Sequence, residues 1–336
     1  MHPYIEFLID KASKLHGKVA VPDGQFDERV LEACVRVHKA GWLDVVMVGS
    51  RAEYEKMASK FGFDITGMTI VDPDETDEFA DYCKEYGVMR AKENLTPEQI
   101  EAVLREPVAL AMMLVKHGKV DGVCSGVYYS TADVARPAIK ILGLQKGVSK
   151  MTALGVMIFE DTPIGKNLVY CAADGTILPN PTAEELAEIA ILATDKAKAI
   201  LPTEPLTAML SFSTCGSAKH EMVDKVTTAL KIANEKRPDL KIDGEFQLDT
   251  AISPRVAEKK MKRPSEVAGK ANVLIWPDLQ AGNMVGKGMM IMGSGMLVGA
   301  TFLGLNGFVN DHSRGATVDE IVTNIAFVGA QIEENK

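Results

Sequence analysis

Residues 18–48 read KVAVPDGQFDERVLEACVRVHKAGWLDVVMV, and this stretch decides the fold. One β-rich run occupies 18–22 and a second occupies 44–48. Between them, within 27–42, apolar side chains recur at spacings that place them on one face of a helix. They are Val30, Leu31, Cys34 and Val37. The stretch therefore predicts a strand, a covering helix and a second strand.

Strand-like and helix-like runs keep alternating along the rest of the chain. Further strands are expected at 68–71, 120–124, 152–160, 168–173, 207–212 and 271–276. Further helices are expected within 76–119 and at 131–142, 182–199 and 218–236. This alternation predicts an α/β fold with mainly parallel sheets that helices cover on both faces. In such folds, ligands bind at the carboxyl ends of the strands.

The composition is that of an ordinary globular protein. The chain has 336 residues, 46% hydrophobic and 25% charged, which suits two domains. Its formal net charge of -9 argues against a general affinity for nucleic acid. The five cysteines are scattered without a C-x-x-C pair, so neither a disulfide framework nor a zinc site is predicted. The N-terminal residues show no signal-peptide pattern, and a cytoplasmic location is expected.

One uncharged segment, 288–309, raises the question of a membrane span. Six glycines interrupt it, together with Ser294, Thr301 and Asn306. A buried helix followed by a buried parallel strand at 297–303 fits this pattern better. The sequence therefore predicts no membrane association.

The stretch NDHSRGATVDEI, residues 310–321, carries the clearest chemical signal. Thr317 is a plausible N-cap, and Glu320 completes a capping-box pattern ahead of an apolar helical face. That face comprises Val318, Ile321, Val322, Ile325 and Ile332. A helix N-terminus favours anions, and Arg314 beside it offers a planar fork for phosphate oxygens. The alternative is an ordinary helix start with a solvated arginine.

Three loops that follow predicted strands are rich in hydroxyl groups, small residues or cations. They span 125–137, 211–219 and 277–287. Ser130 and Arg136 could hold a phosphorylated ligand at a helix start, although Ser130 also fits a simple N-cap. Asn283 lies where a glycine lets the backbone approach a ligand, and Lys287 follows one turn later. No G-x-G-x-x-G or P-loop motif is present, so nucleotide redox cofactors are not expected.

Taken together, these segments resemble the phosphate acetyltransferase family, also called phosphotransacetylases, over nearly the whole chain. The matching motifs are VPDG (21–24) with DERVL (27–31), STAD (130–133) with RP (136–137), NPT (180–182) with LAEIA (186–190), MLSFS (209–213) with GSA (216–218), DGEFQLD (243–249), AGKANVL (268–274), PDL (277–279) with GN (282–283) and Lys287, and SRG (313–315). Many ordered motifs make this resemblance specific.

The resemblance implies reversible transfer of an acetyl group between CoA and inorganic phosphate. CoA, acetyl phosphate and phosphate would be substrates, with no bound cofactor and no metal in the chemical step. It also implies two three-layer α/β domains like those of isocitrate and isopropylmalate dehydrogenases, an active-site cleft between them, and usually a homodimer. The expected domains are 1–148 plus 308–336, and 149–307.

The resemblance also implies roles for residues at matching positions. Arg314 would hold the phosphate of the acyl phosphate, and Ser313 would hydrogen-bond the developing oxyanion. Glu320 would deprotonate the CoA thiol, which needs a base or a positive field to become a nucleophile. Arg90 and Arg136 match arginines used toward CoA or the acyl phosphate. Further substrate contacts are expected from Ser130, Thr131, Ser213, Asn283 and Lys287.

Two positions depart from the family pattern and keep alternatives open. Glu320 replaces an aspartate, and it also fits the capping box. Ile291 stands where the family usually has an arginine, four residues after Lys287. The apolar residue favours a phosphate propionyl- or butyryltransferase, whereas the lost arginine favours a non-catalytic acyl-CoA-binding regulatory module. A decarboxylating dehydrogenase would need a cluster of metal-binding aspartates, which the sequence does not offer.

Overall fold

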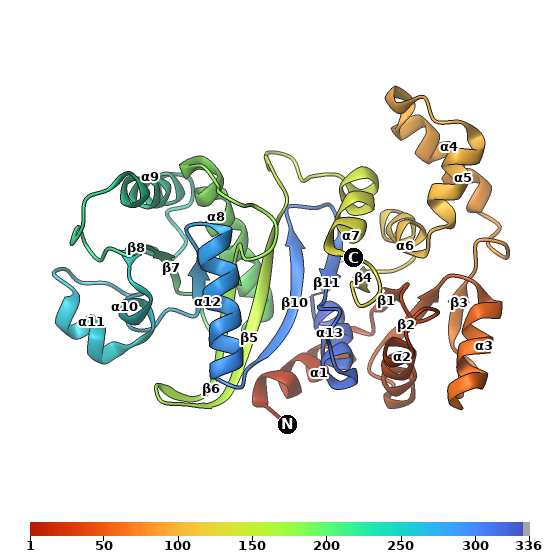
Figure 1. Ribbon diagram of the computed structural model, residues 1–336, viewed down its shortest axis with the longest axis horizontal. Helices are drawn as coiled ribbons and strands as arrows, with labels where there is room; N and C mark the ends of the chain where they lie inside the picture. The colour runs from red at the N-terminus through yellow and green to blue at the C-terminus, as the bar shows by residue number, and fades with distance from the viewer. Residues whose placement is uncertain (332–336) are drawn as a thin grey trace. The chain divides into compact units, whose positions relative to one another are not determined.

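The computed structural model describes residues 1–331, and its ribbon is drawn in Figure 1. The chain divides into two compact units. The terminal unit consists of residues 5–145 and the described part of the C-terminal segment, 305–331. The central unit consists of residues 1–4 and 146–304. Within residues 1–331, no helix combines the length and the hydropathy that crossing a membrane requires.

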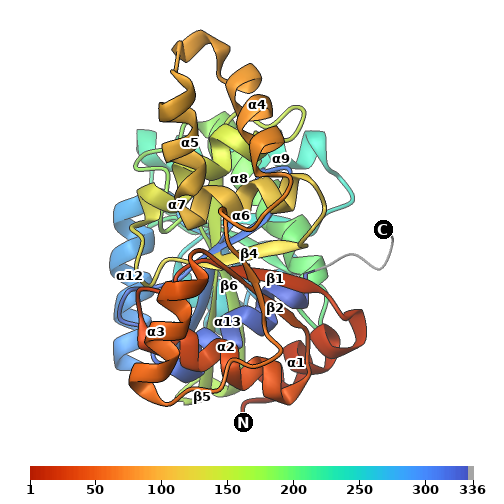
Figure 2. The ribbon, with the colours of Figure 1, turned by 90° about the vertical axis from the view of Figure 1, so that its right-hand side faces the viewer.

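The terminal unit has a parallel sheet in the order β3-β2-β1-β4-β11. Its strands are β1 (Lys18–Val21), β2 (Asp44–Val48), β3 (Thr69–Val71), β4 (Gly122–Ser125) and β11 (Phe308–Asp311). Its helices are α1 (Pro3–Leu15), α2 (Glu28–Ala40), α3 (Arg51–Phe61), α4 (Phe79–Met89), η1 (Ala91–Glu93), α5 (Pro97–Arg105), α6 (Pro107–Lys116), α7 (Thr131–Pro137), η2 (Ala138–Leu142) and α13 (Val318–Gly329). Helices α2 and α13 pack side by side on one face of the sheet, and α6 lies on the other (Figures 1 and 2).

The central unit has a mixed sheet in the order β10-β5-β6-β9-β7-β8. Its strands are β5 (Thr152–Thr162), β6 (Gly165–Ala173), β7 (Thr207–Leu210), β8 (Ile242–Phe246), β9 (Val273–Ile275) and β10 (Met296–Leu303). Its helices are α8 (Ala183–Ile200), α9 (Glu221–Lys236), α10 (Leu248–Ile252), α11 (Pro254–Lys260) and α12 (Leu279–Met292). Strands β6, β9, β7 and β8 are parallel, whereas β5 is antiparallel to both β6 and β10.

The strand–helix–strand unit of residues 18–48 forms as predicted, with β1 and β2 parallel. Asp27 caps α2, because its carboxylate accepts the Arg29 N–H at 2.9 Å. Gly41 ends the helix at a φ of 66°, a left-handed conformation that glycine adopts without strain. The side chains predicted to point inward are all buried: Val30, Leu31, Cys34 and Val37. Local signals therefore suffice to define this unit.

Two expectations for the uncharged segment 288–309 are wrong. Its first part is the end of α12, which is largely exposed: Ile291 and Met292 keep 80% and 89% of their surface accessible. Its strand is β10, which pairs antiparallel with β5. An uncharged run is compatible with a buried strand that pairs either parallel or antiparallel. The composition of an apolar helix does not by itself determine whether another element buries it. The next strand of the chain, β11, begins within the same segment at Phe308.

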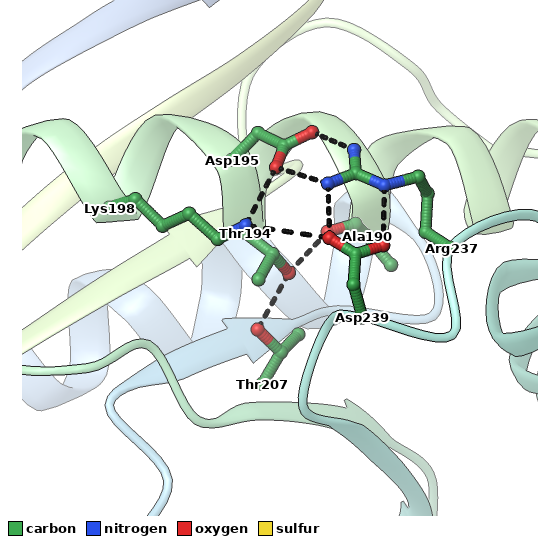
Figure 3. Close-up of polar contacts among 7 residues, drawn as sticks. All are labelled: Ala190, Thr194, Asp195, Lys198, Thr207, Arg237 and Asp239. Carbon is green, nitrogen blue, oxygen red and sulfur yellow. Dashed lines mark hydrogen bonds and ion pairs between the residues drawn. The ribbon is translucent and has the colours of Figure 1, made fainter.

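Arg237, which follows α9, joins that helix to α8 and to the next loop (Figure 3). Its guanidinium donates to Asp239 at 2.7 and 2.8 Å and to Asp195 on α8 at 3.1 Å. Beside it, the buried Thr194 hydroxyl lies 2.7 Å from the Thr207 hydroxyl of β7. These contacts tie α8 to both of its neighbours.

We expect Arg237→Ala to lower the free energy of unfolding by about 1 kcal/mol, because partly exposed ion pairs contribute modestly. The loss should shrink in 1 M salt, where such pairs are screened. Urea denaturation at low and high salt measures both effects. Lys231→Ala on α9, where the lysine is exposed and 3.9 Å from Glu235, is the control and should change stability by less than about 0.5 kcal/mol. An Arg237 effect that is equal at both salt concentrations would contradict the electrostatic account.

Candidate active site

The carboxyl ends of β1, β4 and β11 lie next to one another in the parallel sheet of the terminal unit. Asp23 follows β1, Ser125 ends β4 and Asp311 ends β11, with Ser125 and Asp311 paired in register. This is the edge of an α/β sheet at which ligands bind. This edge is therefore a candidate site, and each of the three strands contributes one polar residue to it.

Asp23 organises the loop after β4. Its buried carboxylate accepts the Ser125 hydroxyl at 2.6 Å and the N–H groups of Gly126 and Tyr128 at 3.0 and 2.9 Å. Burial raises the pKa of Asp23, and these hydrogen bonds oppose that shift. Gly126 adopts a φ of +116°, and a Cβ there would lie 2.3 Å from Asp311 Oδ1. The loop therefore requires glycine at the point where it passes Asp311.

Asp311 is a second buried carboxylate at this edge. Its Oδ2 accepts the hydroxyl hydrogen of Thr131, the first residue of α7, at 2.7 Å. Its Oδ1 is buried and has no hydrogen-bond partner among the described residues. Burial raises the pKa of Asp311 to about 6; the nearby Asp23 charge adds to this, whereas the Thr131 hydrogen bond and the Arg314 charge oppose it. The carboxyl group thus titrates close to neutral pH.

The Ser313–Arg314–Gly315 loop follows β11 and is exposed. Arg29 of α2 holds it from behind, donating to the carbonyl oxygens of Ala316 at 2.8 Å and Arg314 at 3.1 Å. The same guanidinium forms a paired contact with Asp27 at 2.7 and 3.0 Å, which fixes its orientation. Because Arg29 binds only the backbone of Arg314, the Arg314 guanidinium stays available at the surface.

The capping box predicted at the start of α13 is confirmed. Glu320 Oε2 accepts the Thr317 N–H at 2.7 Å and the Thr317 hydroxyl at 3.1 Å, while Thr317 Oγ1 accepts the Glu320 N–H at 3.3 Å. The predicted apolar face lies on this helix, where Ile321 and Ile325 are buried. Ile332, which was expected on the same face, lies outside the described residues. The Glu320 carboxylate is therefore turned toward the helix start.

The other predicted residues of the terminal unit lie on or near α7. Ser130 caps this helix, accepting the Asp133 N–H at 3.3 Å and donating to its carboxylate at 2.6 Å, so the N-cap interpretation is confirmed. Arg136 is exposed and lies 3.6 Å from Asp133. Arg90 is ion-paired with Glu93. The structure brings Thr131, Asp311 and the Arg314 loop together, and it gives Arg90 a carboxylate partner of its own.

Three predicted residues belong to the central unit. Ser213, after β7, is fully buried: its hydroxyl donates to Glu245 at 2.8 Å and accepts the Ala218 N–H at 3.1 Å. It holds its own loop in shape in the structure. Asn283 and Lys287 are exposed on α12, one turn apart. A substrate contact for these three residues stays a prediction.

Three residues that shape this edge were not among the predicted site residues: Asp23, Arg29 and Asp311. Two of them had a usable signal, because Asp23 directly follows the first predicted strand and Asp311 lies inside the 310–321 stretch. Arg29 lies in the matched DERVL motif (27–31), but nothing in the sequence links it to its partners Arg314 and Ala316, which are 285 and 287 residues away.

The sequence model of the phosphate acetyl/butaryl transferase family matches residues 4–328. The chain belongs to this family. A phosphate acetyltransferase from Thermoanaerobacterium thermosaccharolyticum is 39% identical over 330 residues, which cover 98% of this chain and 99% of that protein. A solved phosphotransacetylase from Streptococcus pyogenes has a TM-score of 0.89 at 36% identity and covers 99% of this chain and 98% of its own. The EutD phosphotransacetylase from Staphylococcus aureus has a TM-score of 0.88 at 35% identity, covering 98% of both chains.

These similarities confirm the family resemblance and the α/β fold with mainly parallel sheets. The matched range 4–328 extends over residues from both units, including β11 and most of α13. The family match therefore includes the 313–315 loop together with Thr131 and Asp311.

Proposed function

We infer that this phosphate acetyl/butaryl transferase catalyses the reversible reaction of acetyl-CoA with phosphate to give acetyl phosphate and CoA. The main support for this function is the near-complete match to phosphate acetyltransferases, which extends through the exposed Ser313–Arg314 loop. The test is a coupled assay of the purified protein with CoA and acetyl phosphate, following thioester formation. No thioester despite measurable CoA binding would favour the regulatory-module alternative.

The chemistry needs no enzyme nucleophile, because the CoA thiolate attacks the carbonyl of acetyl phosphate directly. Arg314 binds the phosphate through bidentate hydrogen bonds from its guanidinium. Ser313 donates a hydrogen bond from its hydroxyl to the oxyanion that develops on the carbonyl oxygen. The Ser313 oxygen accepts the Gly315 N–H at 3.3 Å, which leaves its hydrogen free for this purpose. Holding both substrates in line supplies much of the remaining acceleration.

The other substrate contacts are proposed at the positions that match family motifs. The set comprises Arg90, Ser130, Thr131 and Arg136 in the terminal unit and Ser213, Asn283 and Lys287 in the central unit. Among them, Arg136 and Lys287 are exposed cations that suit the phosphates of CoA.

Glu320 is tested separately, because its predicted role as thiol base competes with its role as helix cap. We expect Glu320→Gln to keep the cap, since a glutamine oxygen still accepts the Thr317 N–H, and to lower turnover less than tenfold. Initial rates and urea denaturation of the same variant measure the two roles. A loss of about a hundredfold or more at unchanged stability would assign Glu320 the base role.

Acyl-chain preference is the one point on which a second activity has specific support. Ile291 takes the position of a family arginine and is exposed on α12. Comparing acetyl, propionyl and butyryl phosphate in the same assay decides between an acetyltransferase and a butyryltransferase.

We also propose that the protein works in the cytoplasm as a homodimer and that its two units correspond to the domains expected at 1–148 plus 308–336 and 149–307. Sedimentation equilibrium measures the oligomeric state. Limited proteolysis that releases a stable central fragment would support the domain boundaries.

A further inference from the structure

The reaction moves one proton as well as one acetyl group. The CoA thiol must lose a proton to become the nucleophile, and the departing phosphate must gain one to leave as hydrogen phosphate. A thiol with a pKa near 8.5 is mostly protonated at neutral pH, so a positioned acceptor increases the rate. An acceptor that can also return the proton to phosphate would serve both steps.

We propose that Asp311, acting through the hydroxyl group of Thr131, accepts the proton of the CoA thiol and returns it to the departing phosphate. This inference rests on the proposed transferase activity. In the forward step the S–H bond breaks, the thiol proton binds Thr131 Oγ1, and the original Thr131 proton moves to Asp311 Oδ2. In the return step the same exchange runs backwards, toward the phosphate oxygen whose bond to the acyl carbon has broken.

The hydrogen bond between the two residues has the direction that this relay needs. Thr131 donates its only hydroxyl hydrogen to Asp311 at 2.7 Å, so its oxygen presents lone pairs outward. While Asp311 is ionised, Thr131 can therefore accept a hydrogen from a ligand but cannot donate one; once Asp311 carries the proton, Thr131 accepts from Asp311 and can donate outward. Before the transfer, a protonated thiol is the suitable partner for such an oxygen; after it, the departing phosphate oxygen is. Thr131 is half-buried and Asp311 is buried behind it, which makes the hydroxyl the link between the surface and the carboxylate.

The surroundings of Asp311 keep it a competent proton acceptor. The charged groups that face it are Asp23 after β1 and Arg314 after β11, while α7 contributes the neutral Thr131 and the β4 loop the backbone of Gly126. Burial raises the pKa of Asp311 to about 6, which is closer to the pKa of a thiol than the pKa of an ordinary aspartate is. The Asp311 carboxylate is nevertheless still mostly ionised at neutral pH. Its neighbour His312 is no competitor, because burial lowers the pKa of His312 to about 4 and the ring lies against Cys124.

Glu320 is less well arranged for the same task. Its Oε2 accepts two hydrogen bonds from Thr317, which orient the carboxylate toward the start of α13. Asp311, by contrast, has one oxygen bound to the Thr131 hydroxyl and the other without a partner among the described residues. Protonation of Asp311 therefore changes only its hydrogen bond with Thr131, which is part of the proposed relay.

The test is the pH profile of kcat/KM for CoA between pH 5 and 9, in wild type, Asp311→Asn and Thr131→Val. The wild-type value should fall below pH 6 as Asp311 becomes protonated. Asp311→Asn should be about a hundredfold slower near pH 6.5, with the deficit shrinking toward pH 8.5, where thiolate forms unaided. Thr131→Val should reproduce this pH-dependent deficit, and Thr131→Ser should restore the wild-type profile.

A purely structural role would lower the rate by the same factor at every pH. That outcome, or a Thr131→Val profile equal to wild type, overturns the relay. Asp161→Asn, on an exposed part of β5, is the matched control and should leave the profile unchanged. Thr131 is partly exposed, so its variants remain informative even where Asp311→Asn fails to fold. If the wild-type protein makes no thioester at all, the proposed function fails instead, and the two failures are distinct.

Discussion

Arg314→Lys should lower kcat/KM for acetyl phosphate by about 10²- to 10³-fold. A guanidinium binds two phosphate oxygens at once in a fixed plane, whereas an ammonium group is a point charge on a flexible stem. The carbonyl oxygens of Arg314 and Ala316 stay bound to Arg29 in the variant, so the loop backbone keeps its position. The loss should therefore come from the missing fork and not from a displaced loop. Initial rates at saturating CoA measure it.

The control is Arg255→Lys, which changes an exposed arginine on α11 in the same conservative way. It should leave both kinetics and stability unchanged. Urea denaturation of Arg314→Lys should match that of the wild type. A folded Arg314→Lys protein with wild-type turnover would remove Arg314 from the phosphate site.

Asp23→Ala should lower the free energy of unfolding by about 3–5 kcal/mol, a larger effect than any other substitution considered for stability. Its carboxylate satisfies the Ser125 hydroxyl and the N–H groups of Gly126 and Tyr128 in a buried place. Removing it leaves those donors without an acceptor while the chain around them stays packed. Urea denaturation measures the loss.

Asp44→Ala, at the exposed start of the neighbouring strand β2, provides the matched control. It removes a carboxylate without burying an unsatisfied group, so it should change stability by less than about 0.5 kcal/mol. Equal losses of unfolding free energy in the two variants would mean that the Asp23 hydrogen bonds do not contribute to stability. Activity of Asp23→Ala should fall as well, because the loop it organises passes directly beside Asp311.

The sequence predicts those parts of the fold that local signals specify. Asp27 and Gly41 mark the two ends of α2, and Thr317 with Glu320 marks the start of α13. The direction of β10 was not predictable, because an uncharged run fits either pairing. The strand Phe308–Asp311 was not predicted because half of its residues are polar, and one of them, Asp311, belongs to the candidate site.

Only part of the candidate site could be predicted from the sequence. Arg314 and Ser313 stand in a recognisable motif, but the carboxylates that shape the site come together only through strand order. Asp23 and Ser125 lie 102 residues apart and Thr131 and Asp311 lie 180 residues apart, yet each pair shares a hydrogen bond. No spacing rule in a single sequence links such positions, since the sheet order β1-β4-β11 brings them together.

The placement of β11 has a consequence for how the protein is made. During synthesis, β1 and β4 emerge early, but β11, which pairs with the other edge of β4, emerges only after the whole central unit. A growing chain therefore exposes an unpaired edge of β4 through the translation of more than half of the protein, and pairing across such a separation is slow. Arg314, the proposed phosphate ligand on the loop after β11, is therefore among the last groups to reach its place. If the proposed phosphate site is correct, an incomplete nascent chain lacks it, and we expect activity only after the C-terminal segment has folded back.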